Sequence, residues 1–283
     1  MSDFLEAIVR YRFMLNAVLM GLIASVACGV IGTYVVTRRI TYLAGGIAHS
    51  VLGGMGVAYY LAQGHHLKGV QPIHGAIVAG LLAAVIIGLV SLKAKQREDT
   101  VIGALWAVGM AVGIIFISAT PGYNQDLMSY LFGNILLVSS SSLWVAGVLD
   151  LVVVTIGLLF YNQFLAVCFD EEFARVRGIN VEFYYLLLLS LTALTVVILA
   201  NVVGIILVIA LLTIPAAIAG FFTRTLWQTM LLAVLVSASL TTFGLAASYG
   251  PNLPSGATIV VLSGSAYLVI TVLWWLRRVR RTG

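Results

Sequence analysis

Three ionisable side chains stand within otherwise apolar segments of this 283-residue chain: His49, Asp150 and Asp126. Placing such a group in hydrocarbon is costly, so residues of this kind by default mark a pathway for an ion or a proton. No nucleophile with an adjacent general base accompanies them, which argues against an intramembrane enzyme. The chemistry to expect is therefore binding or passage rather than bond breaking.

His49 lies ten residues beyond Arg39, which is roughly 15 Å along a helix and places it near the middle of a bilayer. Gly45 and Gly53 lie one turn to either side, on the same helical face. Two interpretations are open. The glycines leave space around an imidazole that lines a path, or they let a neighbouring backbone pack beside a hydrogen-bonded histidine. The sequence favours the path, because a packing face has no use for an ionisable group.

Asp150 lies about seven residues into an expected span, where a carboxylate faces the bundle interior, is protonated or pairs with a cation. The alternative is an aspartate hydrogen-bonded to a neighbouring helix or hydrated near the interface. Asp126 begins a short apolar segment and suits a helix N-cap, where it would also line an outer vestibule. Gly109 and Gly113 have the spacing of a helix-packing motif.

The elements that must position these residues are transmembrane helices. Charged residues make up 9% of the chain and hydrophobic ones 61%, against about 25% charged in a soluble domain, and a span needs about 20 apolar residues. We predict an all-α, polytopic transmembrane bundle of about nine spans, with eight as the alternative. The expected spans are Phe13–Val36, Thr41–Leu61, Gly75–Leu92, Val101–Thr120, Leu143–Tyr161, Phe183–Ala200, Val202–Phe222, Leu226–Tyr249 and Gly256–Leu276.

Two further features complete this single transmembrane domain over residues 1–283. The uncharged stretch Phe183–Phe222 has 40 residues and would be about 60 Å long as one helix, so it must turn, and Asn201 with Gly204 is the expected place. Leu127–Val138 is apolar but has only 12 residues, which favours a re-entrant or interfacial helix.

Lys and Arg residues set the expected orientation, because they concentrate in cytosolic loops. They fall between alternate spans and after the last one, whereas the opposite loops carry only Lys68. The C-terminus is therefore expected in the cytosol and the start of the first span outside. Residues 1–12 read as an interfacial segment. The outer loop holds His65, His66 and His74, which are either solvated or a metal-capture site.

A polar cytosolic region, residues 162–181, contains Phe169–Asn180, whose spacing and mixed charge indicate a short surface helix. Such a helix serves either as a docking element or as a solvated connector. Gly178 is placed as its stop signal. In the docking interpretation, the residues that carry the contact are Asp170, Glu171, Glu172, Ala174 and Gly178.

Several functions are excluded or disfavoured by what the sequence lacks. No P-loop motif occurs, so any ATP must be bound by another subunit. The basic residues sit at helix ends, which indicates membrane topology and no nucleic acid partner. Cys28 and Cys168 form no metal motif, and Cys28 reads as a small buried hydrophobe. No permanently bound cofactor is expected.

Four stretches in order resemble the membrane subunits of bacterial ABC importers for manganese, zinc and iron, the metal ABC-3 type, over nearly the whole chain. These stretches are Arg38–Ser50, Asp126–Gly133, Phe169–Asn180 and Val203–Ala219. The resemblance implies a bacterial cytoplasmic (inner) membrane permease without its own ATPase site. It also implies a homodimer, cytosolic P-loop ATPase subunits and an extracytoplasmic metal-binding protein. Residues 169–180 would be the coupling helix.

The family usually has an aspartate one turn before the histidine of the metal path, and here that position is Gly45. His49 itself matches the family. Imidazole suits zinc, manganese or iron, and carboxylate adds hard-oxygen character and negative charge. Either Asp150 or Asp126 would then supply the missing charge, or the path is less charged than usual.

Two other transporter classes compete with a divalent-metal importer. An ABC permease for an iron chelate, haem or vitamin generally has ten spans and a longer chain. A secondary transporter driven by an ion gradient often carries inverted repeats and broken helices. No convincing repeat is present here, and such a protein has no use for a charged cytosolic helix.

Overall fold

The chain is helical in the residues that this computed structural model describes, which are 2–64, 69–94, 98–120, 133, 135–251 and 253–282. In chain order the helices are α1 (Ser2–Arg10), α2 (Arg12–Thr37), α3 (Thr41–Gly64), α4 (Pro72–Leu89), the π-helical turn η1 (Val90–Ala94), α5 (Glu98–Ser118), the 3-10 turn η2 (Ile135–Leu137), α7 (Ser140–Leu159), α8 (Tyr161–Phe169), α9 (Glu171–Val176), α10 (Val181–Val203), α11 (Ile205–Gly220), α12 (Leu226–Tyr249) and α13 (Ser255–Thr282). A helix satisfies its own backbone, as hydrocarbon requires.

Seven of these helices are long and apolar enough to cross a membrane: α2, α4 with its η1 extension, α5, α7, α10, α12 and α13. The helix α11 is apolar but has 16 residues. The helix α3 has 24 residues, and its apolar sequence is interrupted by glycines, tyrosines and His49. The all-α multi-pass bundle is confirmed, and the count of nine spans stays a prediction.

The long uncharged stretch breaks where expected. Helix α10 ends at Val203, and α11 begins directly after Gly204, whose φ of 94° lies in the left-handed region that favours glycine. Gly133 packs against the backbone of Val203 at this break, so a side chain at position 133 would collide with the main chain. The predicted turn near Asn201 and Gly204 is therefore confirmed.

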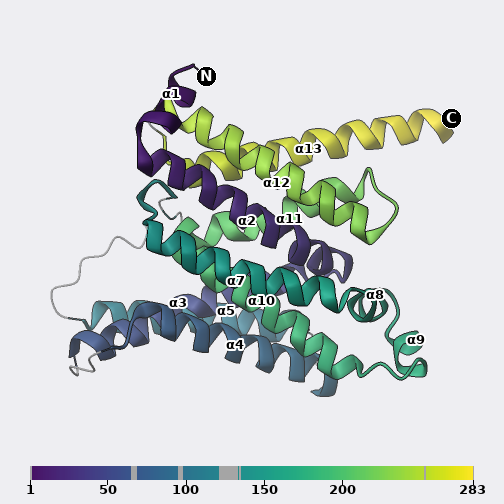
Figure 1. Ribbon diagram of the computed structural model, residues 1–283. Helices are drawn as coiled ribbons and strands as arrows, with labels where there is room; N and C mark the ends of the chain where they lie inside the picture. The colour runs from purple at the N-terminus through teal and green to yellow at the C-terminus, as the bar shows by residue number, and fades with distance from the viewer. Residues whose placement is uncertain are drawn as a thin grey trace.

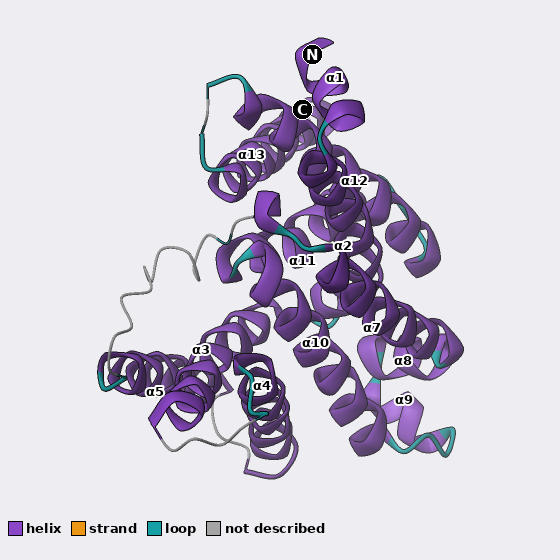
Figure 2. Cartoon of the chain, turned by 60° about the vertical axis from the view of Figure 1, so that its left-hand side comes forward, coloured by secondary structure: helices purple, strands orange, loops and turns teal. Residues whose placement is uncertain are grey.

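The helices form two groups joined by α10. Helix α3 packs between α4 and α5, and α4 also packs on α10. In the second group α2 contacts α7, α11 and α12, while α13 packs on α11 and α12. Figure 2 shows α3, α4 and α5 standing to one side, with α10 between them and the group around α2. His49 therefore belongs to the smaller group.

The contact between α3 and α5 depends on glycine. A Cβ added to Gly53 would lie 2.7 Å from the carbonyl oxygen of Gly109, and one added to Gly113 would lie 2.8 Å from the carbonyl oxygen of Leu52. Real Cβ atoms do not approach other atoms so closely. The two backbones touch because both helices lack side chains along this line, as in other membrane helix pairs.

The two ends of the bundle differ. Figure 1 shows α9 and the C-terminus at one end and the N-terminus at the other. Helix α1 occupies the expected interfacial segment, and its buried Phe4 lies edge-on to Tyr249 with ring centroids 6.2 Å apart. The expected re-entrant helix Leu127–Val138 lies outside the described residues, apart from residue 133 and residues 135–138.

Replacing Gly109 by alanine is expected to lower the free energy of unfolding by about 1–3 kcal/mol, the usual cost of overpacking. The added Cβ would lie 2.6 Å from the Cα of Ser50, and backbone cannot rotate away. Gly103→Ala in the same helix is the matched control, because nothing lies within 4 Å of its Cβ position. Thermal unfolding in detergent measures both, and equal midpoints would contradict this packing.

Candidate functional site

His49 lies at the interface of α3 and α5, where it stacks on an aromatic ring. Its side chain is 8% exposed, and its ring centroid lies 4.2 Å from that of Trp106 with an interplanar angle of 17°. The Nδ1 atom of His49 has no hydrogen-bond partner among the described residues. The structure thus holds a buried imidazole within α3, with one ring nitrogen that makes no hydrogen bond to the described residues.

Trp106 also packs against Gly45, the position at which the resemblance described above leads us to expect aspartate. A Cβ added to Gly45 would lie 3.0 Å from Cζ3 of Trp106. A carboxylate at position 45 would therefore require the indole to move. The indole fills the space that Gly45 leaves, and it was missed by sequence analysis because an aromatic residue within a span carries no distinguishing signal.

Ser50, the residue after His49, adds a polar contact between the same two helices. Its hydroxyl donates to the carbonyl oxygen of Gly46 at 2.8 Å and lies 3.4 Å from that of Leu105 on α5. Ser50 also lines an apolar cleft of about 510 Å³ between α3, α4 and α5, which extends to His74 at the start of α4. The cleft runs from the beginning of α4 to the residue beside His49.

Asp150 lies elsewhere. It is buried on α7, and both carboxylate oxygens lack a hydrogen-bond partner in the described part of the chain. It lines a cavity of about 210 Å³ against Ile23 and Val26 of α2. His49 lies instead between α3 and α5. One chain therefore does not bring Asp150 and His49 together.

Asp126 lies outside the described residues, so its predicted place at an outer vestibule is not tested. Among the residues that the structure does describe, no group of three or more His, Cys, Asp or Glu side chains could hold a metal ion. The described part of one chain thus contains no complete coordination shell.

The predicted cytosolic helix is present as α9. The Asp170 side chain accepts a hydrogen bond from the backbone N–H of Phe173 at 2.9 Å, which caps the helix start. At the other end Gly178 has a φ of 76°, and its N–H donates to the carbonyl of Arg175 at 3.0 Å. A second bond joins Ile179 to the helix, so the stop has the hydrogen bonds of a Schellman motif.

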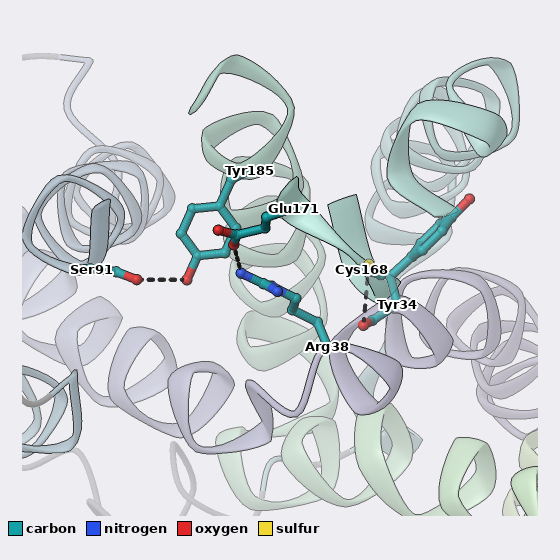
Figure 3. Close-up of polar contacts among 6 residues, drawn as sticks. All are labelled: Tyr34, Arg38, Ser91, Cys168, Glu171 and Tyr185. Carbon is teal, nitrogen blue, oxygen red and sulfur yellow. Dashed lines mark hydrogen bonds and ion pairs between the residues drawn. The ribbon is translucent and has the colours of Figure 1, made fainter. Parts of the chain in front are cut away.

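The other candidate coupling residues divide between the two faces of α9. The side chain of Ala174 is fully buried on the inner face of α9, whereas the side chain of Glu172 is exposed. Glu171 forms an ion pair with Arg38 at the end of α2 (Figure 3). Sequence analysis missed Arg38 in this role, because the two residues lie 133 positions apart.

Apolar side chains lie exposed around the same helix. Phe173 is 52% exposed, and Val176 and Phe169 are exposed still further. The guanidinium of Arg177 lies 5.4 Å from the ring centroid of Phe173. These exposed apolar side chains form the apolar tip of α9, and charged side chains surround it.

Both cysteines are free and buried. Cys28 is completely enclosed, which confirms its interpretation as a small hydrophobe. Cys168 on α8 lies with its Sγ 4.0 Å from the carbonyl oxygen of Tyr34. Burial raises the pKa of the Cys168 thiol to about 12, although the nearby Arg38 charge lowers it.

These observations define a multi-pass membrane protein with a buried histidine between α3 and α5 and a capped, partly apolar helix at one end. The sequence matches the ABC 3 transport family over residues 10–274, and the chain belongs to that family.

Similar proteins cover almost the whole chain. An uncharacterised membrane protein of Synechocystis sp. is 44% identical, over 94% of this chain and 93% of its own length. The manganese transport system membrane protein MntC of Listeria monocytogenes is 36% identical, over 94% and 92%. The solved structure of PsaBC from Streptococcus pneumoniae in complex with Fab gives a TM-score of 0.84 at 30% identity, over 95% of this chain and 94% of that chain.

Replacing Asp150 by leucine is expected to raise the free energy of unfolding by about 1–3 kcal/mol, because it removes a buried carboxylate without a partner. Asp150→Glu serves as the control that keeps the charge. Thermal unfolding of the purified chain measures the change. A lower midpoint for Asp150→Leu would contradict this expectation and show that the carboxylate stabilises the folded chain.

Proposed function

We propose that this chain is the transmembrane subunit of an ATP-driven importer of divalent transition-metal ions, with manganese as the first candidate. Membership of the ABC 3 transport family and the name of the Listeria relative support this proposal. The observation that carries it is His49, a buried imidazole in a span with an available Nδ1. Imidazole binds manganese, iron and zinc, and the ion is the transported substrate rather than a resident cofactor.

In this proposal His49 lines the ion path and Trp106 limits its width. A transport site must release its ion, so an incomplete set of ligands from one chain suits the function. The remaining ligands would come from a second copy of the chain, from Asp126 or from water. Asp150 is proposed as a separate acidic position, because α7 holds it away from His49.

Each end of the bundle is assigned a different protein partner in this proposal. The apolar tip of α9 is proposed to dock in a cytosolic P-loop ATPase subunit, and the opposite end is proposed to receive an extracytoplasmic metal-binding protein. Lys and Arg at the α9 end support its cytosolic placement, together with the C-terminus, in a bacterial inner membrane. Counting α3 and α11 as spans gives nine crossings, surrounded by lipid.

Replacing His49 by alanine is expected to lower metal uptake by at least about tenfold, because the path loses its imidazole ligand. The measurement is uptake of manganese, zinc and iron into proteoliposomes that contain the chain, its ATPase and its binding protein. Leu235→Ala is the control, because this exposed side chain lies on α12, outside the α3–α5 group. Normal uptake of every ion by a well-folded His49→Ala protein would show that His49 does not line the ion path.

Replacing Phe173 by alanine or reversing the charge of Glu172 is expected to weaken ATPase binding by about tenfold or more, as at other interface hot spots. Both side chains are exposed on α9, so the bundle should fold normally. The measurement is the affinity of the purified permease for its ATPase subunit. Val9→Ala, an exposed apolar residue in α1 at the other end, is the control. Unchanged affinity in both α9 variants would show that α9 is not part of the interface with the ATPase subunit.

A further inference from the structure

The ion pair between Arg38 and Glu171 joins the proposed docking helix directly to the end of α2. Glu171 occupies the first turn of α9, and Arg38 is the C-cap residue of α2. The two side chains are 31% and 24% exposed. At this depth their attraction is screened less than that of a pair on the open surface.

A second helix holds the same guanidinium in place. The Cζ atom of Arg38 lies 5.4 Å from the ring centroid of Tyr185 on α10. The Tyr185 hydroxyl lies 3.4 Å from the Oγ atom of Ser91, in the π-helical turn that follows α4. Figure 3 shows the Arg38 side chain reaching from the end of α2 to Glu171, with the Tyr185 ring beside it. Arg38 thus contacts α9 and α10 together.

Arg38 is also attached rigidly to the start of α3. Arg39 has a φ of 64°, so a non-glycine residue occupies the left-handed position that usually ends a helix with glycine. The N–H of Arg39 donates to Val36 at 3.1 Å, and that of Ile40 donates to Val35 at 3.0 Å. These bonds form a Schellman motif, and a residue held in this conformation is fixed by its surroundings.

The path from this turn to the buried imidazole is short and helical. Helix α3 begins at Thr41, and His49 follows eight residues later, at roughly 12 Å along the axis. A displacement of Arg38 therefore displaces the first turn of the helix that carries His49. The route from α9 to His49 contains one ion pair, one hydrogen-bonded turn and two turns of helix.

We propose that Arg38 is a positioning residue that transmits movement of α9 to α3 and thereby to His49. This inference rests on the proposed function, in which α9 docks on an ATPase and His49 lines the path. Nucleotide-driven movement of α9 pulls on Glu171, and Glu171 moves the α2–α3 turn through the guanidinium. The face of the Tyr185 ring guides that movement.

The test is a double-mutant cycle on the complete complex in proteoliposomes. Arg38→Gln and Glu171→Gln are each expected to lower the number of manganese ions transported per ATP hydrolysed by about tenfold. The double variant should lose about the same tenfold rather than a hundredfold, because both changes break one link. Arg224→Gln, an exposed arginine between α11 and α12 and outside this route, should keep the wild-type ratio.

Measurements of membrane abundance and thermal unfolding distinguish a variant that has lost transmission from one that has lost its fold. If either glutamine variant unfolds, Arg38→Lys provides the measurement, because it keeps the charge but loses the planar contact with Tyr185. A ratio below the wild-type value in folded Arg38→Lys protein supports the inference, and a wild-type ratio in that protein overturns it. A normal ratio in Arg38→Gln, or a hundredfold loss in the double variant, overturns it. A wild-type complex that transports no metal overturns the proposed function and this inference with it.

Discussion

The close approach of backbones around α3 is the constraint on which the smaller helix group depends. Lipid offers no hydrophobic gain for helix association, so packing must come from intimate contact. Gly53 and Gly56 of α3 face Gly109 and Gly113 of α5, and Gly54 faces Gly75 of α4. This contact buries Ser50 and His49. The position of the imidazole therefore depends on the packing of three helices rather than on α3 alone.

The same contact explains how the site differs from the usual family pattern. With α5 drawn against α3, the Trp106 indole lies flat on His49 and fills the volume beside Gly45. A carboxylate and an indole cannot share that volume without movement. Gly45 on α3 and Trp106 on α5 therefore belong to one packing arrangement.

The helices could be predicted from the sequence because uncharged stretches of span length have few alternatives in lipid, and Gly204 was identifiable as a break because the stretch was too long. The α9 caps at Asp170 and Gly178 were local signals of the same kind. The site was less predictable. Trp106, and the pairing of Arg38 with Glu171, depend on contacts between distant segments. The separation of Asp150 from His49 likewise follows from helix arrangement, which one-dimensional spacing does not encode.

The burial of Cys28 and Cys168 has a practical consequence. They are the two cysteines of the whole chain, and neither offers a thiol to the surface of the folded subunit. A reporter cysteine introduced at an exposed position such as Val176 would be the one readily reactive thiol, with the native pair left in place. Distance spectroscopy normally requires a protein without reactive native cysteines, and this chain meets that requirement with both of its cysteines in place. The motions of its helices can therefore be followed without first altering its core.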